Sequence, residues 1–348
     1  MALALNPARV LVIHVTRIGD TLMTSPALYA IAQAFPQAHL TFLGHPKRAE
    51  LIENLPFISK VGKISKHSAP WRDRLSGRRW DVAFVYGYDI ALVRYALRTC
   101  DRVLAFRQAD PVINAQLHAI GERPSDNSMH MVDQFLLLPK LLGIKESGRT
   151  ERYTVAPAEQ KQATQQLALD TPHSARPLIG LVIESFPTKP YRDWHVSHFI
   201  ELARKTLAHY PNAHFLLLGG KITAEKIASL QNALGRHMTV YAGRLSLRET
   251  AAIMQRLNLY IGVDTGPTHI AGALGIPMVA LYHCMHPASS FRPLENDHCI
   301  ALDHPNLGSV KCNEQSSMSE ITTTQVWQAM QSILEGQGLD CTAQSGRY

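Results

Sequence analysis

The chain has 348 residues, which is long for a single hydrophobic core and predicts two domains. Hydrophobic residues make up 46% and charged residues 18%, a balance that excludes a disordered chain. The formal net charge of +7 indicates an acidic partner, such as nucleic acid, an anionic membrane surface or a phosphorylated substrate, or else a soluble enzyme with a basic surface.

The first half of the chain alternates segments typical of strands and of helices. Apolar runs predict buried strands at 9–15, 39–43, 61–64, 81–86 and 102–106. Apolar residues at helical spacing predict helices at 28–35, 47–54, 90–97 and 129–142. A more polar stretch from 143 to 177, with a helix at 159–167 inside it, indicates the domain boundary. We place an N-terminal domain at 1–165 and a C-terminal domain at 172–348.

The second half repeats this alternation. Strands are predicted at 178–183, 214–218, 238–241, 259–263 and 278–282. Helices are predicted at 197–207, 223–234, 246–255 and 324–334, with a short one between 263 and 278; Ser246 and Glu249 form a capping box at the third. The α/β pattern predicts two Rossmann-like domains with parallel sheets facing a central cleft, where a ligand would bind beyond the strand ends.

The cysteines and the lengths of the apolar segments indicate the cellular compartment in which the protein is expected. The five cysteines are odd in number and lack a C-x-x-C pair, so we expect no zinc knuckle, no disulfide framework and a reducing compartment: Cys100, Cys284, Cys299, Cys312 and Cys341. Polar residues at 6–9 interrupt the apolar start, which argues against a signal peptide. The longest apolar stretch, 270–284, is shorter than the roughly 20 residues that span a bilayer. A cytoplasmic protein is therefore expected.

The loop after the predicted strand 259–263 has the sequence Asp-Thr-Gly-Pro-Thr-His. Thr265 can cap the following helix, and Gly266 lets the backbone approach a ligand. The helix N-terminus favours an anion, to which Thr265, Thr268 and His269 can add hydrogen bonds. Asp264 would repel a phosphate and is expected to bind sugar hydroxyls. An ordinary capped turn is an equally good interpretation of this loop alone.

Two further loops of the second half carry candidate ligand groups. Ser185, Thr188, Lys189 and Arg192 offer hydroxyls and cations where a diphosphate can lie, although a solvated loop has the same composition. The glycines at 219–220 precede Glu225, whose carboxylate can accept ribose hydroxyls or can simply lie on the surface.

The loop after the first strand holds one carboxylate, Asp20, at a helix start. This loop lacks G-x-G-x-x-G, and the chain has no G-x-x-x-x-G-K-[ST] pattern, which argues against a dinucleotide site and a P-loop. Gly19 permits a tight turn, and Asp20 can take a proton from an attacking hydroxyl. From the spacing alone, an aspartate that caps the helix is the simpler interpretation.

A basic stretch follows the third predicted strand and contains two tryptophans, Trp71 and Trp80. It can meet an anionic acceptor or lipid head groups, or it can form a solvated face. Its cations are Lys60, Lys63, Lys66, Arg72, Arg74, Arg78 and Arg79.

Three motifs together resemble the ADP-heptose:lipopolysaccharide heptosyltransferases, glycosyltransferase family 9, which build the inner core of bacterial lipopolysaccharide. The first is residues 18–20 (IGD) followed by 24–28 (TSPAL). The second is 264–271 (DTGPTHIA) followed by 273–277 (ALGIP), and the third is 243–247 (GRLSL). The resemblance extends from about Val10 to Trp327.

The resemblance implies a GT-B fold and an inverting, metal-independent transferase with no cofactor. ADP-heptose would be the donor and an anionic lipopolysaccharide core sugar the acceptor. It implies that Asp20 is the general base, with Arg17 and Gly19 on the acceptor side. The donor diphosphate would lie on Thr265, Gly266 and His269, the heptose on Asp264, the ribose on Glu225 and adenine on Leu245.

The sequence departs from the family in two places. Arg192 stands where the family commonly has a lysine two residues before a tryptophan, so Arg192 or Lys189 would be the phosphate cation. Ser317 stands where a cysteine would precede Met318, so no cysteine-based metal site is expected. The alternatives are a GT-B transferase for another nucleotide sugar and a non-catalytic nucleotide-sugar-binding module. We expect no nucleic-acid partner, since no reading motif occurs, while peripheral contact with the cytoplasmic face of the inner membrane fits the charge.

Overall fold

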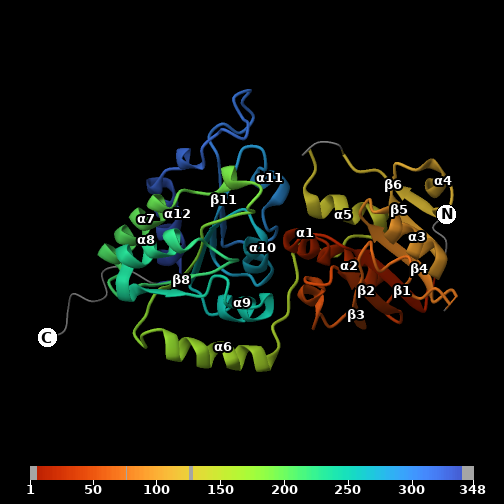
Figure 1. Cartoon of the computed structure of the whole chain (residues 1–348), viewed down its shortest axis with the longest axis horizontal. Coiled ribbons are helices and arrows are strands. Elements are labelled where there is room, and N and C mark those ends of the chain that lie inside the picture. The colour runs from red at the N-terminus through yellow and green to blue at the C-terminus, as the bar shows by residue number, and fades with distance from the viewer. Residues whose placement is uncertain (1–5, 76, 125–127, 339–348) are drawn as a thin grey trace. The chain divides into compact units, whose positions relative to one another are not determined.

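The computed structural model describes residues 6–75, 77–124 and 128–338. The chain forms two compact units, Met1–Thr154 and Val155–Tyr348 (Figure 1). Helix α6 (Pro157–Asp170) belongs to the second unit, because it packs on α9 (Leu247–Met254). The division therefore falls earlier than the bounds at 165 and 172 taken from the sequence. The expectations for residues 1–5 and for Cys341 lie outside the described residues.

The first unit is a six-stranded parallel sheet with the order β3-β2-β1-β4-β5-β6. Its strands are β1 (Arg9–His14), β2 (His39–Gly44), β3 (Lys60–Lys63), β4 (Trp80–Tyr86), β5 (Cys100–Phe106) and β6 (Ala119–Gly121). Its helices are α1 (Ile18–Met23), α2 (Ser25–Ala34), η1 (Ala49–Ile52), α3 (Ile90–Thr99), α4 (Pro111–Asn114) and α5 (Met131–Lys140).

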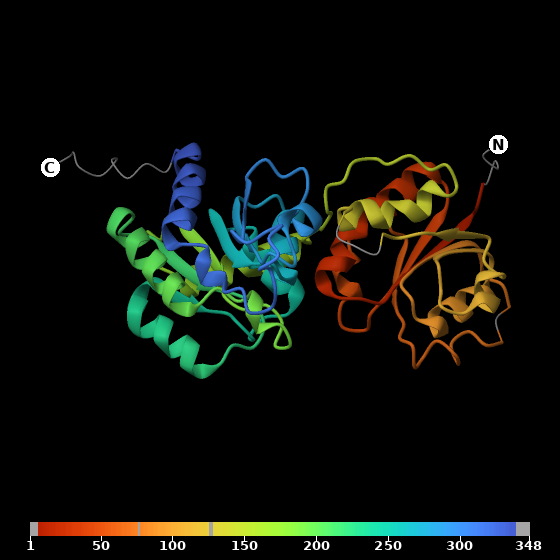
Figure 2. The ribbon, with the colours of Figure 1, turned by 90° about the horizontal axis from the view of Figure 1, so that it is seen from above.

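Helices cover both faces of this sheet because its central strands are apolar on both sides (Figure 2). Leu11 and Ile13 of β1 face a core that includes α3. On the other face, the ring of Phe135 from α5 contacts the rings of His14 and Tyr86, with centroids 5.0 and 5.7 Å apart. The ends of the central strands are thereby fixed from both sides.

The second unit is also a six-stranded parallel sheet, with the order β12-β11-β10-β7-β8-β9. Its strands are β7 (Leu178–Val182), β8 (His214–Leu217), β9 (Met238–Val240), β10 (Leu259–Val263), β11 (Met278–Tyr282) and β12 (Cys299–Asp303). Besides α6 and α9, its helices are η2 (Pro190–Arg192), α7 (Val196–His209), α8 (Ala224–Leu234), η3 (Gly235–His237), α10 (Gly266–Ala273), α11 (Ala288–Phe291), η4 (Met318–Glu320) and α12 (Thr323–Gly336).

The expected α/β class with two parallel sheets is confirmed, and the differences concern short elements. The predicted helix at 47–54 is only the 3₁₀ turn η1. Strands β6 and β12 and helices α4 and α11 were not predicted, since elements of three to five residues are too short to show a periodicity. None of the described helices is long and apolar enough to cross a membrane.

The expectation that the cysteines form no disulfide is wrong, because Cys284 and Cys312 are bonded to each other. Cys284 follows β11, and the segment after β12 folds back across it. The backbone N–H of His304 donates to the carbonyl of Tyr282 (2.9 Å), and the Nε2 of His283 donates to the carbonyl of Ser316 (3.0 Å). These contacts bring together two cysteines that are 28 residues apart in the sequence, which the spacing could not indicate.

Candidate functional site

Three loops of the second unit meet at the carboxyl edge of its sheet. They follow β7, β10 and β11, which are neighbours in the order β11-β10-β7. In parallel sheets with helices on both faces, this edge is where ligands bind. The loops carry Arg192, Asp264 and His286, which lie near one another through the contacts described next.

Arg192 and Asp264 form a buried ion pair, each about 5% exposed. The Arg192 guanidinium donates to the backbone carbonyl of Asp264 (2.7 Å) and also to its carboxylate. Burial alone would raise the pKa of Asp264, but the hydrogen bond from His269 and the charge of Arg192 outweigh it and hold that pKa below its ordinary value. The Asp264 carboxylate is therefore ionised at neutral pH, and the positive charge of Arg192 is partly neutralised by it.

Helix α10 begins beside this pair. His269 lies in its first turn, with Nε2 3.8 Å from a carboxylate oxygen of Asp264. Thr265 is the N-cap residue, but its side chain makes no capping hydrogen bond, contrary to the expected capping role. Thr268 is fully buried and donates to the carbonyl of Val263 (2.6 Å), so it stabilises the fold instead of facing a ligand. The helix N-terminus and the Thr265 hydroxyl are thus placed to receive an anion.

The loop after β7 adds further basic groups. The hydroxyl of Ser185 donates to the carbonyl of Lys189 (3.0 Å), so Ser185 shapes this loop, while Thr188 is exposed. The Nζ of Lys189 lies 3.4 Å from the Nε2 of His286, and the hydroxyl of Tyr191 lies 3.2 Å from the same nitrogen.

His286, which sequence reasoning missed, carries no charge at neutral pH in this arrangement. Burial, followed by the charges of Arg192 and Lys189, lowers its pKa to about 4. Two cations, Arg192 and Lys189, and one carboxylate, Asp264, therefore act on the neutral imidazole of His286. This excess of positive charge suits a ligand with more than one negative charge, such as a diphosphate.

Glu225 and Leu245 lie at the same edge, further along the sheet. Glu225 is exposed in the first turn of α8, which follows β8. Leu245 follows β9 and lines a pocket of about 410 Å³ between α6 and α9. The loops after β8 and β9 are joined by a hydrogen bond from the N–H of Gly243 to the carbonyl of Gly219 (3.0 Å). Gly219 has a φ of +111°, a conformation that favours glycine.

Asp20 lies in the first unit, in the first turn of α1 after the carboxyl end of β1. The N-cap residue of α1 is the exposed Arg17, so the interpretation of Asp20 as the capping residue is wrong. The hydroxyl of Thr16 donates to the Asp20 carboxylate (2.8 Å), and Arg48 donates to the carbonyl of Thr16 (2.9 Å). With the buried Gly19 beside it, this half-buried carboxylate has a fixed orientation.

A buried hydrogen-bond chain supports the Asp20 loop and was also missed in the sequence. The Thr24 hydroxyl donates to the backbone carbonyl of Asp20 (2.7 Å), and His14 Nδ1 lies 2.7 Å from the Thr24 oxygen. Burial and the charge of Arg123 lower the pKa of His14 to about 3, so the imidazole is neutral. Because the Thr24 hydroxyl donates its only proton to the backbone carbonyl of Asp20, the hydrogen bond between His14 and Thr24 must be donated by Nδ1 of His14.

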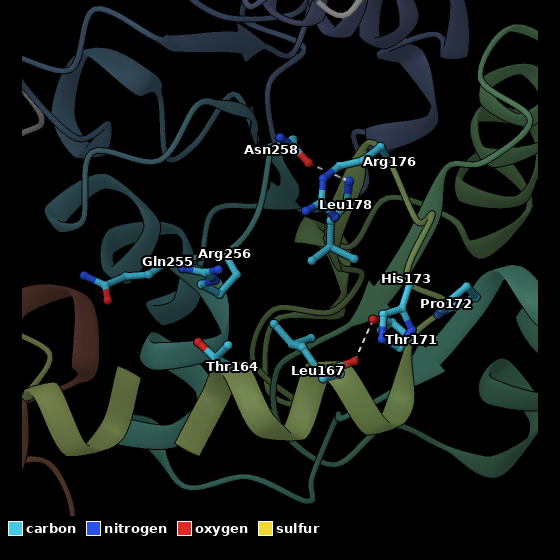
Figure 3. Close-up of a pocket in the computed structure, with 11 residues that line it drawn as sticks. Thr164, Leu167, Thr171, Pro172, His173, Arg176, Leu178, Gln255, Arg256 and Asn258 are labelled. Carbon is cyan, nitrogen blue, oxygen red and sulfur yellow. Dashed lines mark hydrogen bonds between the residues drawn. The ribbon is translucent and has the colours of Figure 1, made fainter. Parts of the chain in front are cut away.

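A different pocket lies at the amino edge of the second sheet (Figure 3). Leu178 at the start of β7 and Asn258 before β10 line it, together with residues of α6. Asn258 accepts a hydrogen bond from the N–H of Leu178 (2.8 Å). None of the candidate site residues from the sequence lines this pocket. The described part of the chain has no group of three His, Cys, Asp or Glu side chains placed to hold a metal ion, and metal independence stays a prediction.

Two units with parallel six-stranded sheets, similar to those of the solved structures described below, are the architecture of the GT-B fold. The chain belongs to glycosyltransferase family 9 (heptosyltransferase), whose model matches residues 112–321. The resemblance to this family is thereby confirmed.

Individual relatives agree with this assignment. The chain is 21% identical over 310 residues to the lipopolysaccharide core heptosyltransferase OpsX of Haemophilus influenzae, a match that covers 86% of each chain. The structure is similar to a family 9 glycosyltransferase of Veillonella parvula, with a TM-score of 0.82, 20% identity and coverage of 97% and 100%. It is also similar to ADP-heptose lipopolysaccharide heptosyltransferase II of Escherichia coli, with a TM-score of 0.74, 19% identity and coverage of 95% and 99%.

Proposed function

We propose that this protein transfers a heptose from ADP-heptose to an acceptor sugar of the lipopolysaccharide inner core, with inversion at the anomeric carbon. The observation that carries the proposal is the buried Arg192–Asp264 pair beside the N-terminus of α10, in a chain of family 9. The names of OpsX and of heptosyltransferase II give the acceptor class and the donor of those proteins.

The donor would lie along the carboxyl edge of the second sheet. Its diphosphate would accept hydrogen bonds at the start of α10, from Thr265, Gly266 and His269, and would meet the charge of Lys189 or Arg192. The heptose hydroxyls would donate to Asp264. The nucleoside would continue past β7 toward β8 and β9, with its ribose at Glu225 and adenine on Leu245, which matches the strand order β10-β7-β8-β9.

The transfer step needs one base and one stabilised leaving group. The Asp20 carboxylate takes the proton of the acceptor hydroxyl, whose oxygen attacks the anomeric carbon from the face opposite the diphosphate. The bond from that carbon to the phosphate oxygen breaks, and ADP leaves with the electron pair. The developing charge is stabilised by the helix start and by Lys189 or Arg192. No metal ion or cofactor takes part in this scheme.

We further propose that the protein works in the cytoplasm, at the inner face of the membrane where a lipid-anchored acceptor would be presented. The test of function is product analysis after incubation with ADP-heptose and truncated lipopolysaccharide acceptors. One additional heptose on the acceptor is expected. Thermal stabilisation by UDP- or GDP-sugars but not ADP-sugars would instead indicate another donor, and no turnover with any acceptor would indicate a binding module.

A further inference from the structure

Strand β3 and the chain that follows it up to β4 hold most of the excess positive charge of the chain. Residues 60–79 contain seven lysine and arginine side chains and one carboxylate, Asp73, in a chain whose net charge is +7. We call residues 60–79, apart from the undescribed residue 76, the basic segment. Lys60, Lys63, Lys66 and Arg74 are exposed.

The single carboxylate of the basic segment is neutralised inside it. Asp73 pairs with Arg72 and Arg79 and accepts a hydrogen bond from the hydroxyl of Tyr95 (2.7 Å). These contacts hold the pKa of Asp73 below its ordinary value even though burial acts to raise it. The outward charges of the segment therefore have no acidic neighbour within it.

The basic segment is anchored to the body of the first unit. Arg98 of α3 donates to the backbone carbonyls of Ala69 (3.0 Å) and Arg72 (2.9 Å), and Ala69 is fully buried in the core beneath α3. Helix α1, which carries Asp20, contacts α5 on the other face of the sheet. The segment is thus a fixed surface, separate from the proton acceptor.

Two large apolar side chains project from this surface. Trp71 is 71% exposed and Leu75 is 99% exposed. The guanidinium of Arg74 lies 5.2 Å from the centre of the Trp71 ring, so a cation accompanies the aromatic ring. An indole beside cationic groups is the arrangement that partitions to the boundary between lipid head groups and acyl chains.

We propose that the basic segment docks on an anionic lipid bilayer. Trp71 and Leu75 enter the interfacial region, while Lys66, Arg74 and the two exposed lysines of β3 meet lipid phosphates. Charge complementarity and the two exposed apolar side chains together favour a bilayer over a solvated face, which would gain nothing from an exposed tryptophan. This inference rests on the proposed function, which places the protein at a membrane. It adds the surface by which the protein would dock there.

The first test uses the intrinsic fluorescence of the unmodified protein. The other three tryptophans, at 80, 194 and 327, are at most 9% exposed, so Trp71 alone reports on a change of solvent. Vesicles of phosphatidylglycerol should shift its emission to shorter wavelength and protect it from acrylamide, and phosphatidylcholine vesicles should not. An unchanged Trp71 signal with both kinds of vesicle would overturn the proposal.

The second test is co-sedimentation with the same vesicles, without donor or acceptor. Trp71→Ser, Leu75→Ser and Arg74→Ala should each weaken binding, the last by about fivefold, as expected for one cation near an anionic surface. Leu169→Ser and Arg256→Ala are matched controls, because both residues are exposed on the second unit. Equal losses in the controls would count against a specific surface.

A third measurement separates this inference from the proposed function. Transfer to a water-soluble core oligosaccharide without lipid should be unchanged in Trp71→Ser, since α1 lies on the other face of the sheet. A raised KM for that oligosaccharide in the variant would show that the segment binds the acceptor sugar, and would overturn the membrane assignment. If the unmodified protein shows no transfer at all, the result would count against the proposed function alone, because vesicle binding is measured without substrates.

Discussion

Arg192 donates hydrogen bonds to both the backbone carbonyl and the carboxylate of Asp264, and solvent scarcely reaches either side chain. Two residues that sequence reasoning assigned to different parts of the donor are therefore held by each other. The pair fixes the end of β10 relative to the loop after β7, so the start of α10, where we propose that the donor diphosphate binds, is held in place without a donor.

Arg192→Ala should weaken both the fold and donor binding. Removal of Arg192 leaves the buried Asp264 carboxylate without its cationic hydrogen-bond partner, which costs about 3–5 kcal/mol in the free energy of unfolding. Urea unfolding and calorimetry with ADP measure the two effects. Lys189→Ala is the matched control, because this half-buried lysine should lower ADP affinity with little change in stability. An unchanged free energy of unfolding in Arg192→Ala would contradict the role of the pair.

Asp20→Asn should abolish transfer and leave ADP affinity nearly unchanged. The amide keeps the size of the carboxylate but cannot accept the proton of the acceptor hydroxyl. Thr16→Val removes the hydrogen bond that orients Asp20 and should lower kcat by a smaller factor than Asp20→Asn. Steady-state kinetics of the three proteins at one pH check both expectations. Transfer at the unmodified rate in Asp20→Asn would rule out its role as the base.

The stability of the first unit should fall in acid partly because of His14. Its pKa is about 3 in the folded chain and near 6.5 when unfolded, so between these values the unfolded state binds the extra proton. The contribution of His14 to the free energy of unfolding is complete above pH 6.5. Below pH 6.5 it declines by about 1.4 kcal/mol for each pH unit, until the pH reaches the pKa of His14 in the folded chain. Urea unfolding at pH 7, 6 and 5 measures the slope.

His14→Gln keeps a side-chain donor for Thr24 but does not titrate. The free energy of unfolding should therefore depend less steeply on pH, by the amount that corresponds to about one proton taken up on unfolding. The exposed His39 provides the control, since His39→Gln should leave the slope as it is in the unmodified protein. An identical slope in His14→Gln would show that the proton is taken up elsewhere, for example at His214, whose pKa burial lowers to about 4.

The Cys284–Cys312 bond should contribute about 3–4 kcal/mol to the free energy of unfolding, as the entropy of closing a loop of this length predicts. Cys312→Ser, or a reducing agent, should lower the thermal midpoint. Cys299→Ser is the control because Cys299 is not in a disulfide. Mass analysis after alkylation of freshly lysed cells would report whether the bond exists in the cell; two alkylated thiols there would show that the contribution is absent in that compartment.

The sequence was most informative where elements are long or motifs are dense. The strands β1, β7 and β10 are buried along nearly their whole length and read as continuous apolar runs, so the two parallel sheets could be predicted. The capping box of Ser246 and Glu249 was also predicted and is present. Short edge strands such as β12 have no such pattern.

The candidate site was only partly predictable, because its contacts join residues that are far apart in the chain. Arg192 and Asp264 are 72 positions apart, and no spacing rule connects them. His286 follows β11 in a stretch without a recognisable motif, and Thr268 looked like a ligand until the fold placed it against Tyr260, whose hydroxyl lies 2.8 Å away. Only the strand order, which brings β7, β10 and β11 together, makes these relationships visible.

Every residue proposed to hold the donor comes from one compact unit, and the proposed base comes from the other. The two halves of the reaction are thereby encoded in separate stretches of the gene. Under the proposed function, mutations that change the sugar delivered should leave the choice of recipient undisturbed, and the converse should also hold. Exchange of whole units between relatives should accordingly yield hybrid enzymes that combine the donor of one parent with the recipient of the other.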